Sequence, residues 1–286
     1  MEPLEGIRLL SLATNIPGPV AVARLVRLGA SGFKVEPPAG DALVIAAPSW
    51  YAALHDGISI SRLDLKTTNG QAQLHDILVE SDLLITANRP AALKRLGLDW
   101  PILAGAYPRL CQVAIVGHPS PDANKPGHDL TYQAELGLVE PPHLPRIMLA
   151  DLAGAEWTVS AALALLLGRD RTGSTADRYT QVALAEAAAA FAVPLQYGLT
   201  APGGLLAGSF PGYNLYPAQE GWVAVAVLES HFMRRLAEEL GLIGGPSGLE
   251  KVTGEALSEA FLDRPAGEWE RWATERDLPI VAVRLS

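Results

Sequence analysis

The chain has 286 residues, of which 49% are hydrophobic and 19% are charged. This composition is typical of a globular protein with one large domain or two modest ones. The formal net charge of -9 argues against a nucleic-acid-binding surface, because such a surface needs an excess of Lys and Arg.

Membrane, secretory and disulfide signals are all weak. The longest mostly apolar run, residues 159–167, is roughly half as long as the ~20 residues that cross a membrane, so we expect no membrane span. The chain begins with acidic residues where a secretory signal carries basic ones, which predicts a cytoplasmic location. Cys111 is the only cysteine, and this excludes an intrachain disulfide and a cysteine-based zinc site. Its apolar surroundings predict an inert core residue rather than a nucleophile.

The first part of the chain alternates strand-like and helix-like segments. Residues 7–12 have the pattern of a strand, 20–28 have helical spacing that ends at Gly29, and 32–36 return as a second strand. The alternation continues with strands at 59–65, 83–86 and 110–116 and helices at 70–80 and 91–96. This order predicts an α/β fold with a doubly wound, mostly parallel sheet covered by helices.

The second part of the chain begins with two Ala-rich helices, predicted at residues 151–167 and 183–195. A linker rich in Gly and Pro follows at 203–212. Beyond it we expect strands at 221–227 and 279–283 and helices at 231–240, 255–262 and 267–276. The chain is therefore predicted to form a large domain over 1–203 and a smaller α+β domain over 204–286.

Several common nucleotide and metal motifs are missing from the sequence. The first β-α turn, residues 14–19, contains only Gly18 and so lacks the three-glycine dinucleotide fingerprint. We also find no P-loop and no His-Glu-x-x-His pair. A nicotinamide enzyme, a nucleoside triphosphatase and a zinc hydrolase are therefore not expected.

An imidazole and several carboxylates supply groups for proton transfer or acyl transfer. His128 follows Pro-Gly in a loop, Asp151 precedes an apolar helix, and Glu229 follows an apolar strand and opens a helix. Each also has a simpler explanation: an exposed loop histidine, a helix N-cap, and an acid that suits the helix dipole. Asp129 could similarly cap the short helix that follows it. Spacing alone leaves these alternatives open.

A set of motifs spread over nearly the whole chain carries a family resemblance. In chain order they are Pro3-Leu-Glu-Gly-Ile-Arg-Leu-Leu10, Pro17-Gly-Pro19, Leu28-Gly-Ala30, Lys34-Val-Glu-Pro-Pro38 with Gly40-Asp41, Leu63-Asp-Leu-Lys66, Arg89-Pro90, Arg95-Leu-Gly-Leu98, Pro108-Arg-Leu110, Gly127-His-Asp129, Ala150-Asp-Leu152, Arg171-Thr-Gly173 and Pro211-x-Tyr213-x-x-Tyr216. With them the chain resembles the family III CoA-transferases, the CaiB/BaiF group, which includes the 2-methylacyl-CoA racemases. The resemblance implies a Rossmann-like large domain, a small domain, and an intertwined homodimer whose active site lies between domains.

The resemblance also implies roles for the three titratable residues. In the transferases an aspartate at the position of Asp151 attacks the acyl-CoA carbonyl and forms a mixed anhydride. In the racemases a histidine and an aspartate, matching His128 and Asp151, act as acid and base on opposite sides of the α-carbon. A glutamate that matches Glu229 orients the histidine.

Coenzyme A, as the acyl-CoA substrate, is the ligand that the resemblance implies, with no metal and no nicotinamide. The positions that match its contacts are Thr14, Asn15, Ile16, Leu63, Lys66, Asn88, Arg89 and Arg95. The three cations among them could neutralise the phosphates of CoA, or could be ordinary surface cations.

The chain departs from the family pattern in two places. The usual Glu-Asn-Phe-Arg-Pro-Gly is Thr86-Ala-Asn-Arg-Pro-Ala91 here, and the C-terminal segment that returns to the large domain is expected to be missing after residues 279–283. The filled His128, Asp151 and Glu229 positions favour an enzyme that epimerises the α-carbon of a 2-methylacyl-CoA. The alternatives are CoA transfer to a carboxylic acid through an Asp151 anhydride, and a non-catalytic paralogue that binds CoA.

Overall fold

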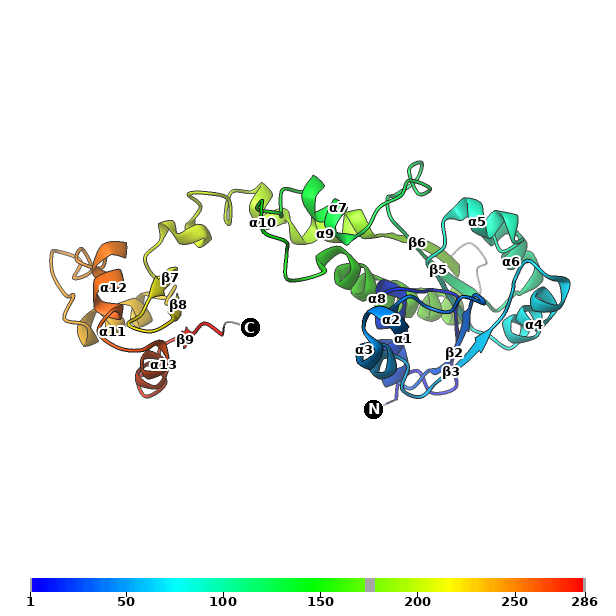
Figure 1. The fold of residues 1–286 in the computed structure, drawn as a ribbon, viewed down its shortest axis with the longest axis horizontal. Helices are drawn as coiled ribbons and strands as arrows, with labels where there is room; N and C mark the ends of the chain where they lie inside the picture. The colour runs from blue at the N-terminus through cyan, green and yellow to red at the C-terminus, as the bar shows by residue number, and fades with distance from the viewer. Residues whose placement is uncertain (1, 173–177, 285–286) are drawn as a thin grey trace. The chain divides into compact units, whose positions relative to one another are not determined.

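The computed structural model describes residues 2–172 and 178–284, and its contacts divide the chain into two compact units, Met1–Ala192 and Val193–Ser286 (Figure 1). Each unit has a hydrophobic core of its own. The sequence placed the domain boundary after residue 203 instead, and that boundary stays a prediction. The last residue of the Arg171-Thr-Gly173 motif lies outside the described residues.

The first unit is built on a six-stranded sheet in the order β3-β2-β1-β4-β5-β6, in which every neighbouring pair is parallel. The strands are β1 (Arg8–Ser11), β2 (Ser31–Glu36), β3 (Ile58–Arg62), β4 (Leu83–Thr86), β5 (Cys111–Val116) and β6 (Tyr179–Ala183). This is the strand order of doubly wound, Rossmann-like sheets. The α/β fold class expected from the sequence is therefore confirmed. One of the strands, β6, falls where no strand was predicted.

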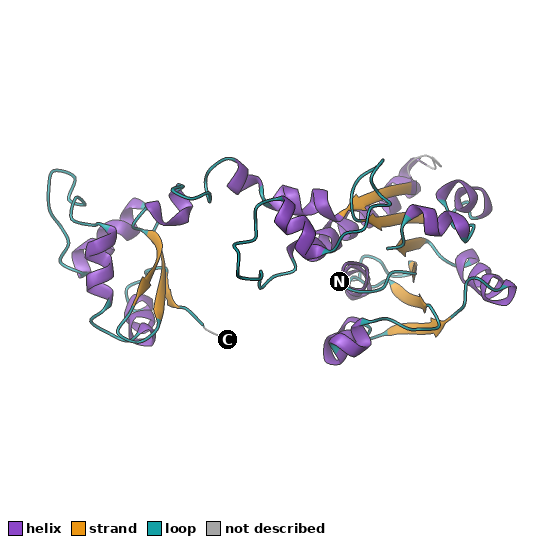
Figure 2. Cartoon of the chain, turned by 45° about the horizontal axis from the view of Figure 1, so that its top comes forward, coloured by secondary structure: helices purple, strands orange, loops and turns teal. Residues whose placement is uncertain are grey.

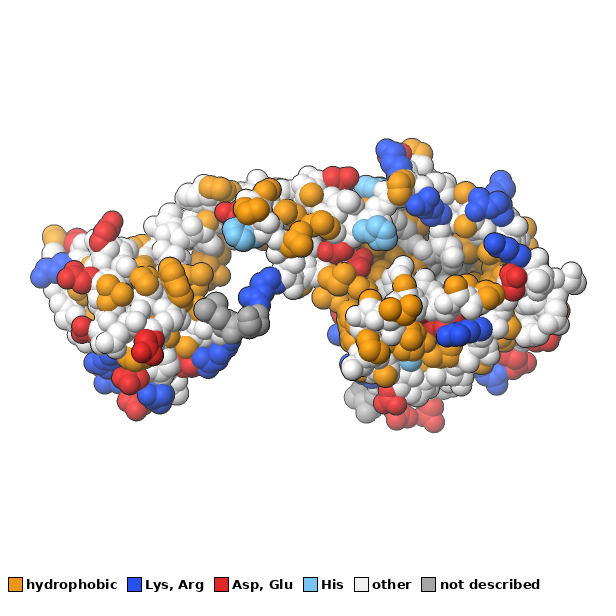
Figure 3. Space-filling model, in the orientation of Figure 1, with side chains coloured by type: hydrophobic (Ala, Val, Ile, Leu, Met, Phe, Trp, Pro, Cys, Tyr) orange, Lys and Arg blue, Asp and Glu red, His pale blue; other side chains and the backbone are white. Residues whose placement is uncertain are grey.

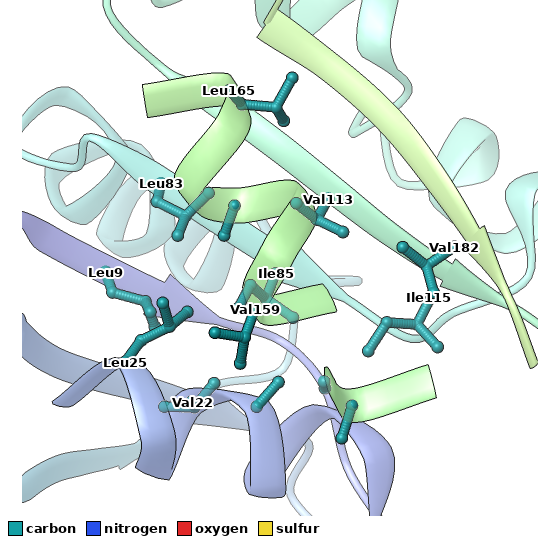
Figure 4. Packing of buried hydrophobic residues seen from close by; sticks show 14 of the residues in the cluster. Leu9, Val22, Leu25, Leu83, Ile85, Val113, Ile115, Val159, Leu165 and Val182 are labelled. Atoms are coloured by element: carbon teal, nitrogen blue, oxygen red, sulfur yellow. The ribbon is translucent and has the colours of Figure 1, made fainter. Parts of the chain in front are cut away.

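Helices cover both faces of this sheet (Figure 2). They are α1 (Pro17–Arg27), α2 (Leu43–Ala46), α3 (Pro48–Leu54), α4 (Thr68–Val79), α5 (Pro90–Arg95), α6 (Trp100–Ala106), α7 (Asp129–Glu135), α8 (Leu149–Thr172) and α9 (Leu184–Phe191). Successive residues of a strand point to opposite faces. Leu83 and Ile85 of β4 accordingly pack with α1 and α8, whereas Leu84 packs with the helices of the other face. Figure 4 shows the first of these cores, with Val159 of α8 among the strand side chains.

Helix α8 is longer than the apolar run seen in the sequence. Within the described chain it is the one helix that is long and apolar enough to cross a membrane by length and composition alone. It packs against α1, α9 and β5, and it buries Ala155, Val159, Ala162 and Leu166 in the core of the first unit. A role as the central core helix accounts for its composition.

The predicted Ala-rich helix at 183–195 is interrupted. Helix α9 ends at Phe191, and the short helix α10 (Val193–Gln196) begins two residues later. Pro194 explains the interruption, because proline has no backbone N–H and its ring clashes with the preceding helical turn. Cys111 is fully buried in β5, and burial raises the pKa of its thiol, as expected for an inert core residue.

The second unit contains a small antiparallel sheet in the order β7-β8-β9, with strands β7 (Tyr213–Pro217), β8 (Trp222–Ala226) and β9 (Ile280–Ala282). Its other elements are α10, the helical turn η2 (Leu205–Ser209), α11 (Ser230–Glu239), α12 (Gly254–Phe261) and α13 (Ala266–Thr274). The core is aromatic: the Trp269 ring meets Phe261 at 5.0 Å and Trp272 at 5.1 Å, both edge to face. The predicted strand at 221–227 and the three predicted helices are present, whereas β7 was not predicted.

Candidate active site

A cavity of about 200 Å³ lies where the central strands of the first unit end. Its wall includes Thr14 and Asn15 after β1, Arg89 after β4, and Gly117 after β5. Strands β1 and β4 are neighbours, and the connections after them run to opposite sides of the sheet. Open α/β sheets bind ligands at this kind of switch point, outside the carboxyl ends of the strands. The cavity, here named the Asp151 cavity, also contains His128, Lys125, Tyr132 and Asp151.

Asp151 lies in the first turn of α8, which begins at Leu149. The expectation that Asp151 directly precedes the helix is therefore wrong. The helix starts earlier because Leu149 and Ala150 are good helix formers, and Ala150 is fully buried in the core. The Asp151 side chain belongs to the helix and is only 9% exposed.

Asp129 holds the start of α8 in place. The backbone N–H of Asp151 donates a hydrogen bond to Oδ1 of Asp129 at 3.1 Å, and Nε2 of Gln133 donates to its Oδ2 at 2.5 Å. Nε2 of Gln133 also donates to the Ile147 carbonyl at 2.9 Å. Asp129 thus satisfies a free N–H of α8 rather than capping α7, in which it is the first residue.

The Asp151 carboxylate receives no hydrogen bond from any residue that the structure describes. Burial, together with the negative charge of Asp129, raises its pKa from 3.8 to about 6. A carboxyl with this pKa is still mostly ionised at neutral pH. A buried carboxylate with unused lone pairs and a raised pKa is suited to act as a nucleophile or as a base.

His128 lines the same cavity as Asp151. It is the N-cap residue of α7, and its backbone N–H donates to Oγ1 of Thr131 at 3.1 Å. The residue is exposed on the cavity side of the loop. The structure thus brings the two sequence-predicted groups His128 and Asp151 to one cavity of the first unit.

A second cavity of about 440 Å³, here named the Lys66 cavity, adjoins the first unit's second strand. Leu63, Lys66 and Asn88 line it, and Thr14 lines both cavities. Six of the eight expected CoA contacts therefore lie at these two cavities: Thr14, Asn15, Leu63, Lys66, Asn88 and Arg89. Leu63 is buried, whereas Lys66 and Arg89 are exposed cations.

The remaining expected residues lie elsewhere. Ile16 is the N-cap residue of α1 and packs on a small apolar cluster with Leu43 and Leu54. Arg95 is exposed at the end of α5 and lines neither cavity. Glu229 is the exposed N-cap residue of α11, in the second unit. Its predicted role beside His128 stays a prediction.

A buried ion cluster supports the first β-α turn. Nζ of Lys34 lies 2.6 Å from Oδ2 of Asp41 and 3.1 Å from Oε1 of Glu36, and all three side chains are almost fully buried. Oδ1 of Asp41 accepts a hydrogen bond from the Asn15 backbone N–H at 3.2 Å. Asn15 has a φ of +69°, a conformation that non-glycine residues seldom adopt. The cluster thus fixes a strained residue in the wall of the Asp151 cavity.

In the described ranges, no group of three or more His, Cys, Asp and Glu side chains has the arrangement of a metal site. The first unit's cavities instead present carboxylates, an imidazole and cations to a small organic anion.

A family model described as CoA-transferase family III matches residues 4–285. The chain belongs to CoA-transferase family III. The resemblance found in the sequence is therefore confirmed, and the members of this family are enzymes that handle CoA thioesters.

Curated relatives of this family III protein are named as CoA-transferases. It is 32% identical over 190 residues to the probable fatty acyl-CoA transferase Rv3272 of Mycobacterium tuberculosis, covering 60% of this chain and 48% of the relative. It is 35% identical over 140 residues to the cinnamoyl-CoA:phenyllactate CoA-transferase of Clostridium sporogenes, covering 44% and 34%. The chain thus spans less than half the length of these two relatives.

Solved structures share the fold. The crystal structure of Rv3272 has a TM-score of 0.81 at 24% identity, and covers all of this chain and 84% of its own. A CAIB/BAIF family protein from Brucella suis has a TM-score of 0.79 at 22% identity, with 99% and 84% covered. At these identities the likeness concerns the fold of the family III protein.

Sequence reasoning missed two residues of the site that have clear physical tasks. Tyr132 lies in the wall of the Asp151 cavity and was noted only as the end of a motif. Asp41 was noted only as part of a matching segment, although a carboxylate seven residues after a buried-strand lysine is a signal of a buried ion pair.

Proposed function

We propose that this family III protein catalyses CoA transfer between an acyl-CoA and a carboxylic acid, with Asp151 as the nucleophile. The observation that carries the proposal is the buried Asp151 carboxylate, which accepts no hydrogen bond within the described chain and faces a cavity at the switch point of the sheet. The relatives named as CoA-transferases support the same reaction.

Each step of the proposed reaction uses the same carboxylate. An Asp151 oxygen attacks the thioester carbonyl carbon, the carbon–sulfur bond breaks, and CoA leaves as a thiolate, which gives a mixed anhydride. The acceptor carboxylate then displaces the donor acid from Asp151. The CoA thiolate attacks the acyl carbon of the new anhydride, which releases the new thioester and restores the Asp151 carboxylate.

The Lys66 cavity supports a place for CoA next to Asp151. Lys66 and Arg89 are exposed cations that could pair with the CoA phosphates, on a protein whose net charge is otherwise negative. Thr14 borders both cavities, so a ligand that follows this residue would pass from the phosphate end to the reacting carboxylate. Asn88 adds a side-chain amide to the same wall.

The test measures exchange of CoA between an acyl-CoA and a labelled carboxylic acid by mass spectrometry. We expect wild-type protein to transfer CoA and Asp151→Asn to lose the activity by at least about 10³-fold, because the nucleophile is removed while the shape is kept. Hydroxylamine should trap an acyl hydroxamate at Asp151 in the wild type only. Transfer at wild-type rate by the Asp151→Asn variant would contradict the proposal.

A second candidate is epimerisation of a 2-methylacyl-CoA, and the presence of His128 and Asp151 in one cavity favours it. Incubation with a chiral 2-methylacyl-CoA in deuterated water would place deuterium on the α-carbon. We expect His128→Ala to abolish this exchange and to leave CoA transfer intact. Unchanged exchange in His128→Ala would exclude epimerisation by this pair. Binding of CoA without either reaction would instead favour the non-catalytic paralogue.

A further inference from the structure

Tyr132 places a hydroxyl in the wall of the Asp151 cavity. It lies one helical turn after His128 in α7, and its backbone N–H donates to the His128 carbonyl at 3.3 Å. The side chain is only 1% exposed, yet it lines the cavity together with His128 and Asp151. Its ring meets the His118 ring edge to face at 5.2 Å, which fixes the direction of the hydroxyl.

Two glycines make room for this hydroxyl. A Cβ atom at either Gly117 or Gly127 would collide with the Tyr132 oxygen. Gly117 follows β5, and Gly127 immediately precedes His128. The hydroxyl is therefore confined between two backbone segments that both line the cavity.

The Tyr132 hydroxyl makes no hydrogen bond to any part of the chain that the structure describes. A buried hydroxyl without a partner costs free energy, typically about 1–3 kcal/mol in proteins. The nearest charges that act on it are the carboxylates of Asp151 and Glu135 and the guanidinium of Arg89. Burial, followed by the charge of Asp151, raises its pKa, so the group stays a neutral O–H donor at every working pH.

We propose that the Tyr132 hydroxyl is a further catalytic residue of this site, which donates a hydrogen bond to the carbonyl oxygen of the acyl group under attack by Asp151. This assignment rests on the proposed CoA-transferase function. When the carboxylate adds to the thioester carbon, the carbonyl oxygen becomes an oxyanion, and a fixed donor stabilises it. No proton moves to the oxyanion: the O–H bond stays intact while the carbon–sulfur bond breaks and the CoA thiolate leaves.

The test is the Tyr132→Phe variant in the full chain. Phenylalanine keeps the ring that packs on His118 and fits between the same two glycines, and only the oxygen is removed. Loss of one oxyanion donor typically lowers kcat by about 10²-fold or more. We expect such a fall in kcat for CoA transfer, a KM for acyl-CoA within about twofold of the wild type, and an unchanged thermal unfolding curve.

A matched control removes a hydroxyl elsewhere in the same unit. The Tyr107 hydroxyl hydrogen-bonds Nδ1 of His75 at 2.6 Å and lines neither the Asp151 cavity nor the Lys66 cavity. Tyr107→Phe should leave kcat unchanged. A second measurement follows the donor directly: the carbonyl stretching band of bound acyl-CoA should lie at lower wavenumber in the wild type than in Tyr132→Phe.

Failure of this assignment differs from failure of the proposed function. A wild-type protein that transfers CoA no faster than Tyr132→Phe, with the same carbonyl band, would overturn the role of Tyr132 alone. A wild-type protein without any transfer would overturn the function and this assignment together. A variant whose kcat falls only in step with a loss of folded protein would likewise overturn the role of Tyr132.

Discussion

Two aspartates on neighbouring helices have opposite tasks. The Asp129 carboxylate is occupied by hydrogen bonds from Gln133 and from the backbone of Asp151. The Asp151 carboxylate is equally buried and accepts none within the described chain. The unequal distribution of hydrogen bonds makes Asp129 structural and leaves Asp151 available for chemistry.

This arrangement predicts that Asp151→Asn stabilises the protein at pH 8. The folded-state pKa of about 6 is higher than the usual 3.8. The stability linked to this group is therefore full below about pH 3.8 and is lost as the pH rises through about 6. Replacing the buried charge with an isosteric amide should raise the free energy of unfolding at pH 8 by up to about 3 kcal/mol. Urea unfolding between pH 5 and 8 measures the gain, which should shrink as the pH falls.

The control is Asp129→Asn. Its carboxylate accepts two hydrogen bonds, so the change should destabilise the protein at pH 8 by about 1–3 kcal/mol. An Asp151→Asn variant that is less stable than the wild type at pH 8 would contradict the prediction.

Among the elements, the first β-α turn depends on a distant ion pair. Lys34 comes from β2 and Asp41 from the loop after it, and Asp41 holds the backbone of Asn15. Burial acts to raise the pKa of Asp41, but hydrogen bonds from Lys34 and from the backbone of Leu43 and Asn15 bring it below its usual value. Asp41 is therefore kept ionised as a support for the cavity wall.

We predict that Asp41→Asn destabilises the protein by about 3–5 kcal/mol, because it leaves the buried Lys34 ammonium without its shortest carboxylate contact. The loosened turn should also raise the KM for acyl-CoA. The matched control is Asp122→Asn, whose pair with Lys125 is exposed and is expected to be worth less than about 1 kcal/mol. Chemical denaturation and steady-state kinetics measure both effects. Equal stability of the two variants would show that the Lys34 pair is not a support.

The elements that the sequence predicted and those that it missed differ in where their stabilisation comes from. Strands such as β4 are continuous apolar runs that local pattern reveals. The edge strand β6 begins with partly exposed polar residues, and pairing with β5 defines it. In the same way β7 exists because it pairs with β8. Tertiary pairing, which one segment does not encode alone, decides both cases.

The site shows the same limit. Motifs identified His128 and Asp151 as candidates, but only the hydrogen bonds between α7 and α8 show that both reach one cavity. The helix start at Leu149 was likewise invisible, because Asp151 is a good N-cap residue by type and Ala150 becomes helical through burial. The unpartnered hydroxyl of Tyr132 is a property of packing that no spacing encodes.

At the scale of the molecule, apolar side chains are left uncovered where the first unit ends and the second begins. Phe191, Val193 and Tyr197 are exposed, Tyr197 by 86%, and Figure 3 shows hydrophobic side chains over the segment labelled α9 and α10 in Figure 1. Contiguous exposed apolar surface often marks an interaction site. It supports the homodimer that the family resemblance implies.

We therefore predict that the protein is a dimer in solution and that Tyr197→Asp shifts it toward the monomer. A charge in an apolar interface is costly when it is left unpaired. Light scattering coupled to gel filtration measures the mass of each. The control is Tyr213→Asp, a half-buried tyrosine of β7 in the second unit. A wild-type protein that is monomeric at micromolar concentration would contradict the prediction.

The position of Asp151 inside α8 has a mechanical consequence. The helix that carries the nucleophile is also the central helix of the core, and Gly154 lets it approach Leu184 so closely that a Cβ atom there would collide. The carboxylate cannot shift without the core shifting as well. We expect Asp151 to stay rigid through the catalytic cycle. Adjustment to acyl groups of different size then falls to the loop of residues 117–128 opposite it, which contributes Lys125 and His128 and belongs to no helix or strand.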